Sequence, residues 1–458
     1  MLGGAPCFDL AYGDESLANL ISRRHRIGTY LGDAFHPLDH PSDLHVPIMT
    51  TGCNTVPRMV PTPARCGPST SDRARWIRPE AHQFMQHQHP HPTHQLADPD
   101  EVSPARPPKQ EQEDATTDVT EVAPGILRTQ LPISMPGLGH VNCYLLEDER
   151  GIAVVDPGLP GDDSWDHLVD RLTRAGFGVE DVHTVVVTHS HPDHFGGAAR
   201  LRHVAGADIV THETFRTLFD LAETKDHEDS EQLDLNAPDD RVAAMERWLA
   251  TPSPWGGRRA GPSPEFLERI RSSTANGSFF STPSPTKPLV DGQTIMLARR
   301  EWVAMHTPGH TYDHLCLYDP EYGVVLTGDH VLPSITPHIS GLTPEADPLA
   351  LFFESLRRMV GIDDVSVALP AHGHPFTDLA GRAEHIIEHH QERLDIIREA
   401  GRDLHEGTVE DFMRVLFKER SWGEMAESET YAHLEHLREL GEMARMTDRG
   451  IAHYAPVD

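Results

Sequence analysis

One short segment, VVVTHSHPDHFGG at positions 185–197, constrains the fold of this chain more than any other. Its three valines are typical of a strand that is buried on both faces of a sheet. Four side chains that can bind metal follow within six positions, namely His189, His191, Asp193 and His194. Ligand sites of α/β sheets lie beyond the carboxyl ends of such strands. The segment therefore predicts an α/β domain with a metal site at that edge.

The spacing inside this segment favours two metal ions. His189 and His191 are two positions apart, so in extended chain they share a face and can bind one ion together. Asp193 and His194 follow the bend at Pro192 and can turn towards a second ion. A mixture of histidine and aspartate suits zinc, and also iron or manganese. The alternative, a polar loop without metal, would require this spacing to arise by chance.

Short apolar runs alternate with helical stretches from about Val119 onward. The first two runs should pair as strands through a turn at 149–151. Interleaved strands and helices indicate a layered α/β domain. We expect strands at 139–148, 151–158, 185–187, 208–212, 302–306, 314–318, 323–329 and 366–371, and helices at 164–175 and after Gly197.

Two parts of the chain depart from this pattern. Residues 1–118 hold 15 of the 38 prolines and nine histidines, which predicts a mostly disordered extension. Met85 is an alternative start, in which case residues 1–84 would come from an over-extended gene model. Residues 214–288 have few strand signals and predict an insertion, either a functional lid or a helical elaboration packed on the outside.

The C-terminal residues 379–458 predict a separate module. A long amphipathic helix begins near residue 380, and Thr408 with Asp411 forms a capping-box pattern at the start of a second helix. A third helix and a hairpin with Gly450 in its turn follow. Three helices followed by a hairpin are the element order of a winged helix.

The remaining motifs complete a family pattern. The segment H-S-H-P-D-H resembles the signature of the metallo-β-lactamase superfamily, and further motifs occur in the order of that family. They are Asp156 in VVDPG, His310 in HTPGH, Asp329 in LTGD and His372 in PAHG. The resemblance covers 119–378 and implies an αββα sandwich, in which Asp156 orients the metal-binding loop.

The resemblance also implies a ligand set, the one that glyoxalase II enzymes share. Each ion has three ligands of its own, and Asp329 binds both ions. The first ion is held by His189, His191 and His310, and the second by Asp193, His194 and His372. We expect two divalent metal ions, with zinc favoured over iron or manganese.

Two divalent ions ~3.5–4 Å apart can share a hydroxide, because each lowers the pKa of bound water towards ~7. This hydroxide can attack an acyl carbon or a phosphorus atom, while the ions stabilise the developing charge. In the family Asp193 lies close to the bridging water, which makes it the candidate catalytic proton shuttle. No G-x-S-x-G motif supports a serine nucleophile.

Neighbouring side chains receive weaker interpretations. We expect His314 to support the ligands from behind and His330 to line the pocket. We expect Cys316 to be a packing residue. Four more histidines divide into rim residues (His338 and His374, or plain surface residues) and structural residues (His212 and His306).

Three functions stay open at this point. The first is hydrolysis of a thioester or ester of a small molecule, such as an acyl-CoA-like compound. The second is hydrolysis of RNA phosphodiesters, because the C-terminal module resembles that of the lactamase-beta-2-like branch, which includes a single-strand endoribonuclease. The third is a regulatory protein that binds nucleic acid or a partner through its winged helix.

Charge disfavours nucleic acid as a partner without excluding it. The chain has a net charge of −32, and residues 380–458 contain 10 basic against 18 acidic side chains. A groove that tracks phosphates should be basic. The winged helix would then serve for packing or for a homodimer contact.

Composition predicts a cytoplasmic protein that does not enter membranes. No window approaches 18 consecutive apolar residues, and the first 20 residues lack the basic start of a secretory signal. The five cysteines are odd in number and scattered, which is typical of reduced thiols.

Overall fold

The computed structural model describes residues 109–135, 137–217, 246–257, 259 and 282–457. All of them belong to a compact unit that extends from Ala97 to Asp458. Most of the predicted disordered extension and most of the predicted insertion lie outside the described residues, so both stay predictions. No described helix is long and apolar enough to cross a membrane.

The first sheet has seven strands in the order β1 to β7. Strands β1 to β4 pair antiparallel, and β4 to β7 pair parallel. The predicted pairing of β3 with β4 is confirmed. The strands are β1 (Thr120–Ala123), β2 (Ile126–Met135), β3 (Leu138–Asp148), β4 (Gly151–Val155), β5 (Val182–Val186), β6 (Asp208–His212) and β7 (Lys287–Leu289).

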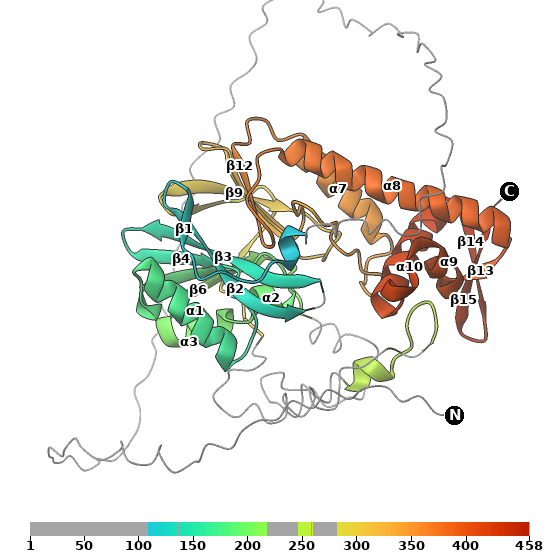
Figure 1. Ribbon diagram of the computed structural model, residues 1–458, viewed down its shortest axis with the longest axis horizontal. Helices are drawn as coiled ribbons and strands as arrows, with labels where there is room; N and C mark the ends of the chain where they lie inside the picture. Colours follow the sequence, from blue (N-terminus) through green and yellow to red (C-terminus); the bar gives the residue numbers. More distant parts are fainter. Residues whose placement is uncertain (1–108, 136, 218–245, 258, 260–281, 458) are drawn as a thin grey trace, which may run out of the picture. The chain divides into compact units, whose positions relative to one another are not determined.

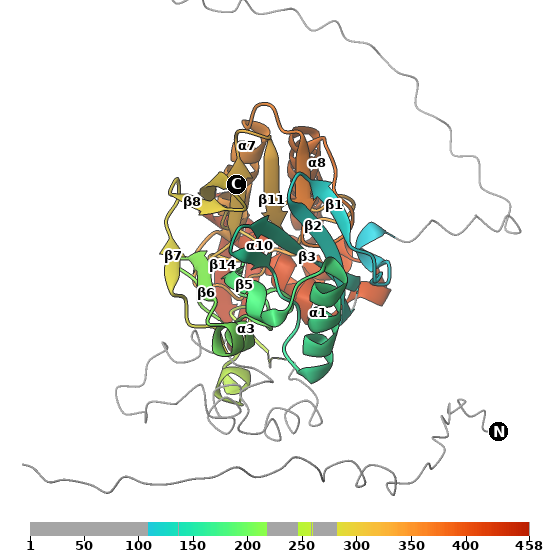
Figure 2. The same cartoon turned by 90° about the vertical axis from the view of Figure 1, so that its left-hand side faces the viewer.

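The second sheet has five strands in the order β12-β11-β10-β9-β8. Helix α7 (Pro348–Val360) connects the parallel neighbours β11 and β12, and the other pairs are antiparallel. Figure 2 shows β7 and β8 on the same side of the molecule. The strands are β8 (Thr294–Leu297), β9 (Arg300–His306), β10 (Leu315–Asp319), β11 (Val324–Gly328) and β12 (Val367–Pro370).

Three buried clusters give four layers. Helices α1 (Asp162–Ala175) and α3 (Ala198–Ala205) contribute Leu168 and Leu201 to a core on the outer face of the first sheet. A second core, with Trp302 and Tyr144, fills the space between the sheets. A third core covers the far face of the second sheet with α7 and α8 (Leu379–Leu404). The layers, seen in Figure 1, confirm the predicted αββα sandwich.

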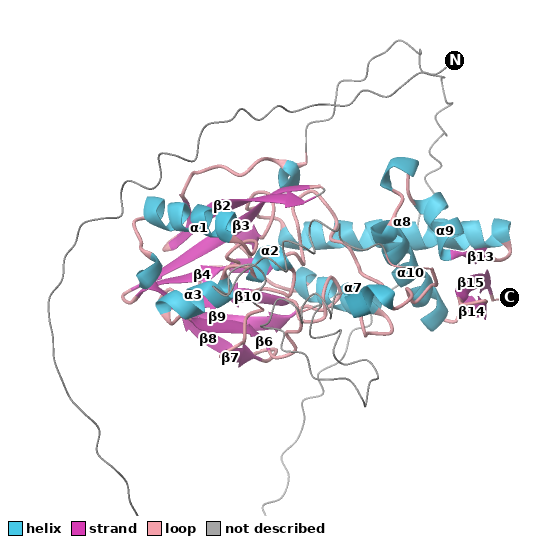
Figure 3. Cartoon of the chain, turned by 90° about the horizontal axis from the view of Figure 1, so that it is seen from below, coloured by secondary structure: helices cyan, strands magenta, loops and turns pink. Residues whose placement is uncertain are grey.

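The C-terminal residues follow the predicted order of elements. After α8 come β13 (Gly407–Thr408), α9 (Val409–Leu416), α10 (Glu424–Glu439), β14 (Met443–Asp448) and β15 (Ile451–Pro456). The capping box of Thr408 and Asp411 is present, and β14 and β15 form the expected hairpin. Figure 3 shows α9 beside this small sheet, whose strand order is β13-β15-β14. The winged-helix assignment stays a prediction.

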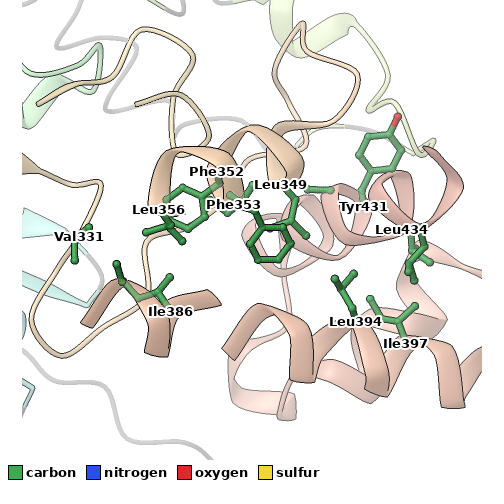
Figure 4. Close-up of a cluster of buried hydrophobic side chains, with 14 of the residues drawn as sticks. Val331, Leu349, Phe352, Phe353, Leu356, Ile386, Leu394, Ile397, Tyr431 and Leu434 are labelled. Carbon is green, nitrogen blue, oxygen red and sulfur yellow. The ribbon is translucent and has the colours of Figure 1, made fainter. Parts of the chain in front are cut away.

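The core of the C-terminal helices is continuous with that of the sandwich. Phe352 on α7, Leu394 on α8 and Leu434 on α10 are all fully buried in one cluster (Figure 4). The predicted domain boundary at residue 379 therefore does not interrupt the packing. As a consequence, α10 contacts α7, the helix that connects β11 to β12.

Ordered structure begins before the predicted boundary at residue 119. Residues Gln110–Gln112 form a short 3₁₀ helix, in which Glu111 is 0% exposed. The Glu111 carboxylate accepts hydrogen bonds from the backbone of Ser334 at 2.8 Å and Ile335 at 3.0 Å. The expectation that order begins near Val119 is therefore wrong, because the structure already describes residues 109–118, whereas the disorder predicted for the residues before them stays a prediction. A buried carboxylate with distant partners leaves no periodic signal in the sequence.

Candidate metal centre

The seven predicted ligands come from four loops at one edge of the two sheets. His189 and His191 follow β5, and Asp193 and His194 lie in the first turn of α2 (Pro192–Phe195). Proline at the first position of a helix sets the entry angle of the chain without loss of a hydrogen bond. The other three ligands follow β9, β11 and β12, and they are His310, Asp329 and His372.

The first group of side chains contains His189, His191, His310 and Asp329, whose ligand atoms all lie within 4.8 Å of one another. His191 Nδ1 is 2.9 Å from His189 Nε2 and 3.1 Å from His310 Nε2. Asp329 Oδ2 lies 3.6 Å from His310 Nε2. Three ring nitrogens and a carboxylate oxygen thus surround one point.

The second group contains Asp193, His194 and His372, also within 4.8 Å. Asp193 Oδ2 is 3.5 Å from the Nε2 atoms of both His194 and His372. Asp329 faces this group as well, because its Oδ1 lies 3.3 Å from His372 Nε2 and its Oδ2 lies 3.6 Å from His194 Nε2. Asp329 therefore stands between the two groups.

The hydrogen bonds of four histidines fix which nitrogen carries the hydrogen. In each case Nδ1 faces an oxygen that can only accept, or whose own hydrogen is engaged elsewhere, so Nδ1 donates. The acceptors are Asp156 Oδ2 for His194 (3.0 Å), His338 O for His310 (2.7 Å), His140 O for His372 (2.6 Å) and Thr188 Oγ1 for His189 (3.1 Å).

The Nε2 atoms of these rings point towards carboxylates, and in a neutral ring each Nε2 presents a lone pair. Nε2 of His194, Nε2 of His372 and Oδ1 of Asp329 are buried without a hydrogen-bond partner. A lone pair that faces an anionic oxygen repels it unless a proton or a metal ion lies between the two atoms. Histidine and aspartate are the donor types that zinc prefers. The residues therefore fit divalent metal ions at both groups.

Electrostatics distinguishes the two groups. Burial lowers the pKa of His191 to about 3, and it also lowers the pKa values of His189 and His310. Burial also opposes charge on His194 and His372, but the carboxylates of Asp193 and Asp329 outweigh it and raise both pKa values. The second group therefore attracts positive charge strongly, which protons or a metal ion can supply.

Asp156 supports the candidate metal-binding loop, as the family resemblance implies. It directly follows β4 and has a left-handed φ of 54°, which an aspartate tolerates better than most residues. Its carboxylate accepts hydrogen bonds from Thr188 N at 2.9 Å and Thr188 Oγ1 at 2.8 Å, in addition to the one from His194. One carboxylate thus holds both ends of the H-S-H-P-D-H segment.

His314 contacts two of the candidate ligands, as expected for a residue that supports them. Its Nε2 accepts a hydrogen bond from Asp329 N at 3.0 Å, and its ring stacks against His189 with 5.1 Å between centroids. His330 is 0% exposed and packs edge-on against Phe352, so its interpretation as a pocket-lining residue is not supported.

The other singled-out residues have structural contacts. His212 and His306 stack with 3.8 Å between ring centroids, and Cys316 is fully buried, as predicted for packing residues. His338 supplies the carbonyl that holds His310, and His374 hydrogen-bonds Glu113.

Sequence reasoning missed the support that β3 gives to His372. His140 accepts from Gly373 N at 3.1 Å, Asn142 Nδ2 donates to the carbonyls of Pro370 and Gly373, and Tyr144 Oη donates to Pro370 O. These three residues alternate along the strand and share a face. A row of polar side chains with period two in an otherwise apolar strand was the available signal.

A second missed contact is made by Ser190, the residue between His189 and His191 in the sequence. Ser190 Oγ donates to Asp313 Oδ1 at 2.9 Å, which ties the His189–His191 loop to the loop after β9. Burial raises the pKa of Asp313 to about 7. Nothing in the sequence pairs these two residues.

Comparison with known proteins shows the class to which this fold and site belong. The family model of the metallo-beta-lactamase superfamily matches residues 136–372, which is more than half of the chain. The chain therefore belongs to the metallo-beta-lactamase superfamily.

Two solved structures are similar over most of this chain. A metallo-beta-lactamase family protein from Thermus thermophilus is 28% identical, covers 74% of this chain and 100% of its own, and has a TM-score of 0.58. A beta-lactamase domain protein from Burkholderia ambifaria is 27% identical, with 75% and 96% coverage and a TM-score of 0.58.

Curated relatives match a shorter segment. An atrochrysone carboxyl ACP thioesterase from Aspergillus fumigatus is 33% identical over 28% of this chain and 29% of its own length. The lactamase-like protein nscB from Trichophyton rubrum is 32% identical over 30% of this chain and 41% of its own. The chain thus spans less than half the length of these relatives.

Proposed function

We propose that this protein is a hydrolase that uses two divalent metal ions, zinc in the first instance, to cleave a thioester of a small molecule. The observation that carries the proposal is the pair of groups on either side of Asp329, in which buried histidine lone pairs converge with carboxylate oxygens. His189, His191 and His310 would hold one ion, Asp193, His194 and His372 the other, and Asp329 both.

Metal ions bound there would activate water as a nucleophile and stabilise the negative charge that develops on a carbonyl oxygen. The chain's own residues supply position and proton transfer. Asp193 would accept the proton of the attacking water at its carboxylate. Burial raises the pKa of Asp193, but His194 and His372 lower it to about 2, so the carboxylate is ionised at neutral pH.

Thioesters are favoured over phosphodiesters for two reasons. Curated relatives that match part of this chain are named atrochrysone carboxyl ACP thioesterases, which supports thioester hydrolysis. In addition, the net charge of −32 opposes the approach of a polyanion such as RNA. We therefore infer a compact acyl thioester, such as an acyl group on a pantetheine arm, as the substrate class.

The test is thiol release from acyl-CoA, acyl-pantetheine and acyl-glutathione thioesters by the zinc-loaded protein. Asp193→Asn should abolish release, whereas Asp163→Asn, the same change at an exposed position of α1, should not affect it. Release that persists at the parent rate in Asp193→Asn would contradict the proposed site. No release from the zinc-loaded parent, with cleavage of a model phosphodiester instead, would replace the thioester proposal.

A further inference from the structure

A chain of polar contacts connects helix α10 to the candidate ligand His310. His310 Nδ1 donates to the backbone carbonyl of His338 at 2.7 Å, which fixes the orientation of the His310 ring. The side chain of His338 extends the other way, and its Nδ1 lies 3.3 Å from Glu429 Oε2 on α10. Arg393 on α8 places Nη2 3.3 Å from the other oxygen of Glu429. The carboxylate is thus held from both sides.

Neighbouring contacts attach the same loop to α10. Gly341 N donates to Ser428 Oγ at 2.9 Å, and His436 Nδ1 lies 2.9 Å from Asp347 Oδ2. Packing is tight, because a Cβ atom at Gly341 would lie 2.5 Å from the ring of Tyr431. The loop that carries His338 therefore takes its position from α10 and not from the sheet alone.

The negative charge of Glu429 stabilises its contacts with His338 and Arg393. Its side chain is 15% exposed and that of Arg393 is 13% exposed. Burial acts to raise the pKa of Glu429, but the hydrogen bond with His338 and the charge of Arg393 hold it well below the usual range. An ionised Glu429 orders the His338 side chain by a charge-assisted hydrogen bond and compensates a buried guanidinium.

An alternative use of Glu429 is a third metal site with His390 and His433, since the ligand atoms of the three lie within 4.8 Å. Two observations oppose it. The Arg393 guanidinium beside Glu429 repels a cation. His433 Nδ1 donates to Glu429 O at 2.7 Å, so its Nε2 is free to accept from His390 Nδ1 at 3.0 Å. A hydrogen bond accounts for this pair without an ion.

We propose that Glu429 is a positioning residue for the candidate metal centre, which acts on His310 through the loop at His338. The inference rests on the proposed role of His310 as a ligand of the first ion. It makes the C-terminal helices part of the metal centre, although they contribute no ligand. The ion held by His310 should respond most, because His338 orients His310, whereas His194 and His372 are oriented by Asp156 and His140.

The test compares zinc binding by the full chain and by Glu429→Ala, through competition with a chromophoric chelator. We expect one of the two zinc ions to bind about tenfold more weakly, at the lower end of effects from residues that orient ligands, and the other to be unchanged. Glu429→Gln keeps an oxygen that accepts from His338 and should recover much of the loss. Glu439→Ala removes a surface carboxylate of the same helix and should bind both ions like the parent.

A second variant tests the route. His338→Ala should weaken binding of the same ion. Its combination with Glu429→Ala should reduce the affinity little further, because both substitutions act through one contact. Equally weaker binding of both ions, together with lower thermal stability, would show general unfolding and overturn the inference. Parent-like zinc binding in Glu429→Ala would also overturn it. A parent that binds no zinc would overturn the proposed metal centre itself.

Discussion

Asp156 Oδ2 accepts a hydrogen bond from His194 Nδ1 at 3.0 Å, and this contact sets the direction of the His194 lone pair. With Nδ1 engaged as donor, Nε2 is the nitrogen that points towards Asp193 and Asp329 and is available to a metal ion. Asp156 is therefore the residue that prepares the second group for a cation. It also holds Thr188, the residue directly before the first candidate ligand.

Substitution of Asp156 should weaken zinc binding without removal of a ligand. In Asp156→Ala the His194 ring loses its acceptor, and Thr188 loses two hydrogen bonds. We expect zinc affinity to fall by about 10–100-fold, the range found for partners that orient metal-binding histidines. Competition with a chelator measures this affinity, and Asp163→Ala, at an exposed position of α1, is the matched control. Unchanged affinity would show that Asp156 serves the fold alone.

Asp313 predicts a pH dependence of stability. Burial raises its pKa to about 7, so the folded state takes up a proton that the unfolded state releases near pH 4. The parent therefore loses stability as pH rises from about 4 to about 7, on the order of a few kcal/mol. Asp313→Asn should remove this loss and gain stability relative to the parent towards neutral pH. Urea unfolding at pH 5 and pH 8 measures it, and an equal difference at both would contradict the assignment.

The continuous core predicts that the sandwich and the C-terminal helices unfold together. Leu394 is 0% exposed in the cluster that joins α7, α8 and α10, so Leu394→Ala should cost about 2–5 kcal/mol. Circular dichroism and tryptophan fluorescence should report one shared transition at a lower urea concentration. An early transition that involves only the C-terminal helices would contradict a common core.

Glu111 predicts a structural role for the residues just before β1. Glu111→Ala leaves the partly buried amides of Ser334 and Ile335 without their acceptor, which should cost on the order of 1 kcal/mol. The same change at Glu384, exposed on α8, should leave stability close to that of the parent. Equal melting temperatures of the Glu111 variant and the parent would show that these two hydrogen bonds do not contribute to stability.

The parts of this protein that the sequence predicts are those with local signals. Strand β5 and the ligands after it lie within one short segment, and alternation or helical spacing marks β3, α1 and α8. Strands β1, β2, β7 and β8 and helix α7 lacked a signal strong enough to be singled out. Because β7 has only three residues, periodicity cannot identify it.

The contacts that support the site were out of reach for a different reason. Glu429 meets His338 91 positions away, and Glu111 meets Ser334 223 positions away. Such partners are brought together by packing, which a single sequence does not encode in any local pattern. The ligands could be found because the family pattern names them, whereas their supporting residues had no such pattern.

The number of zinc ions per chain tests the central claim most directly. Native mass spectrometry of the zinc-loaded protein should show two ions per chain, and His372→Ala, which removes a ligand of the second group alone, should show one. Two ions in His372→Ala, or one in the parent, would contradict a centre of two ions that meet at Asp329.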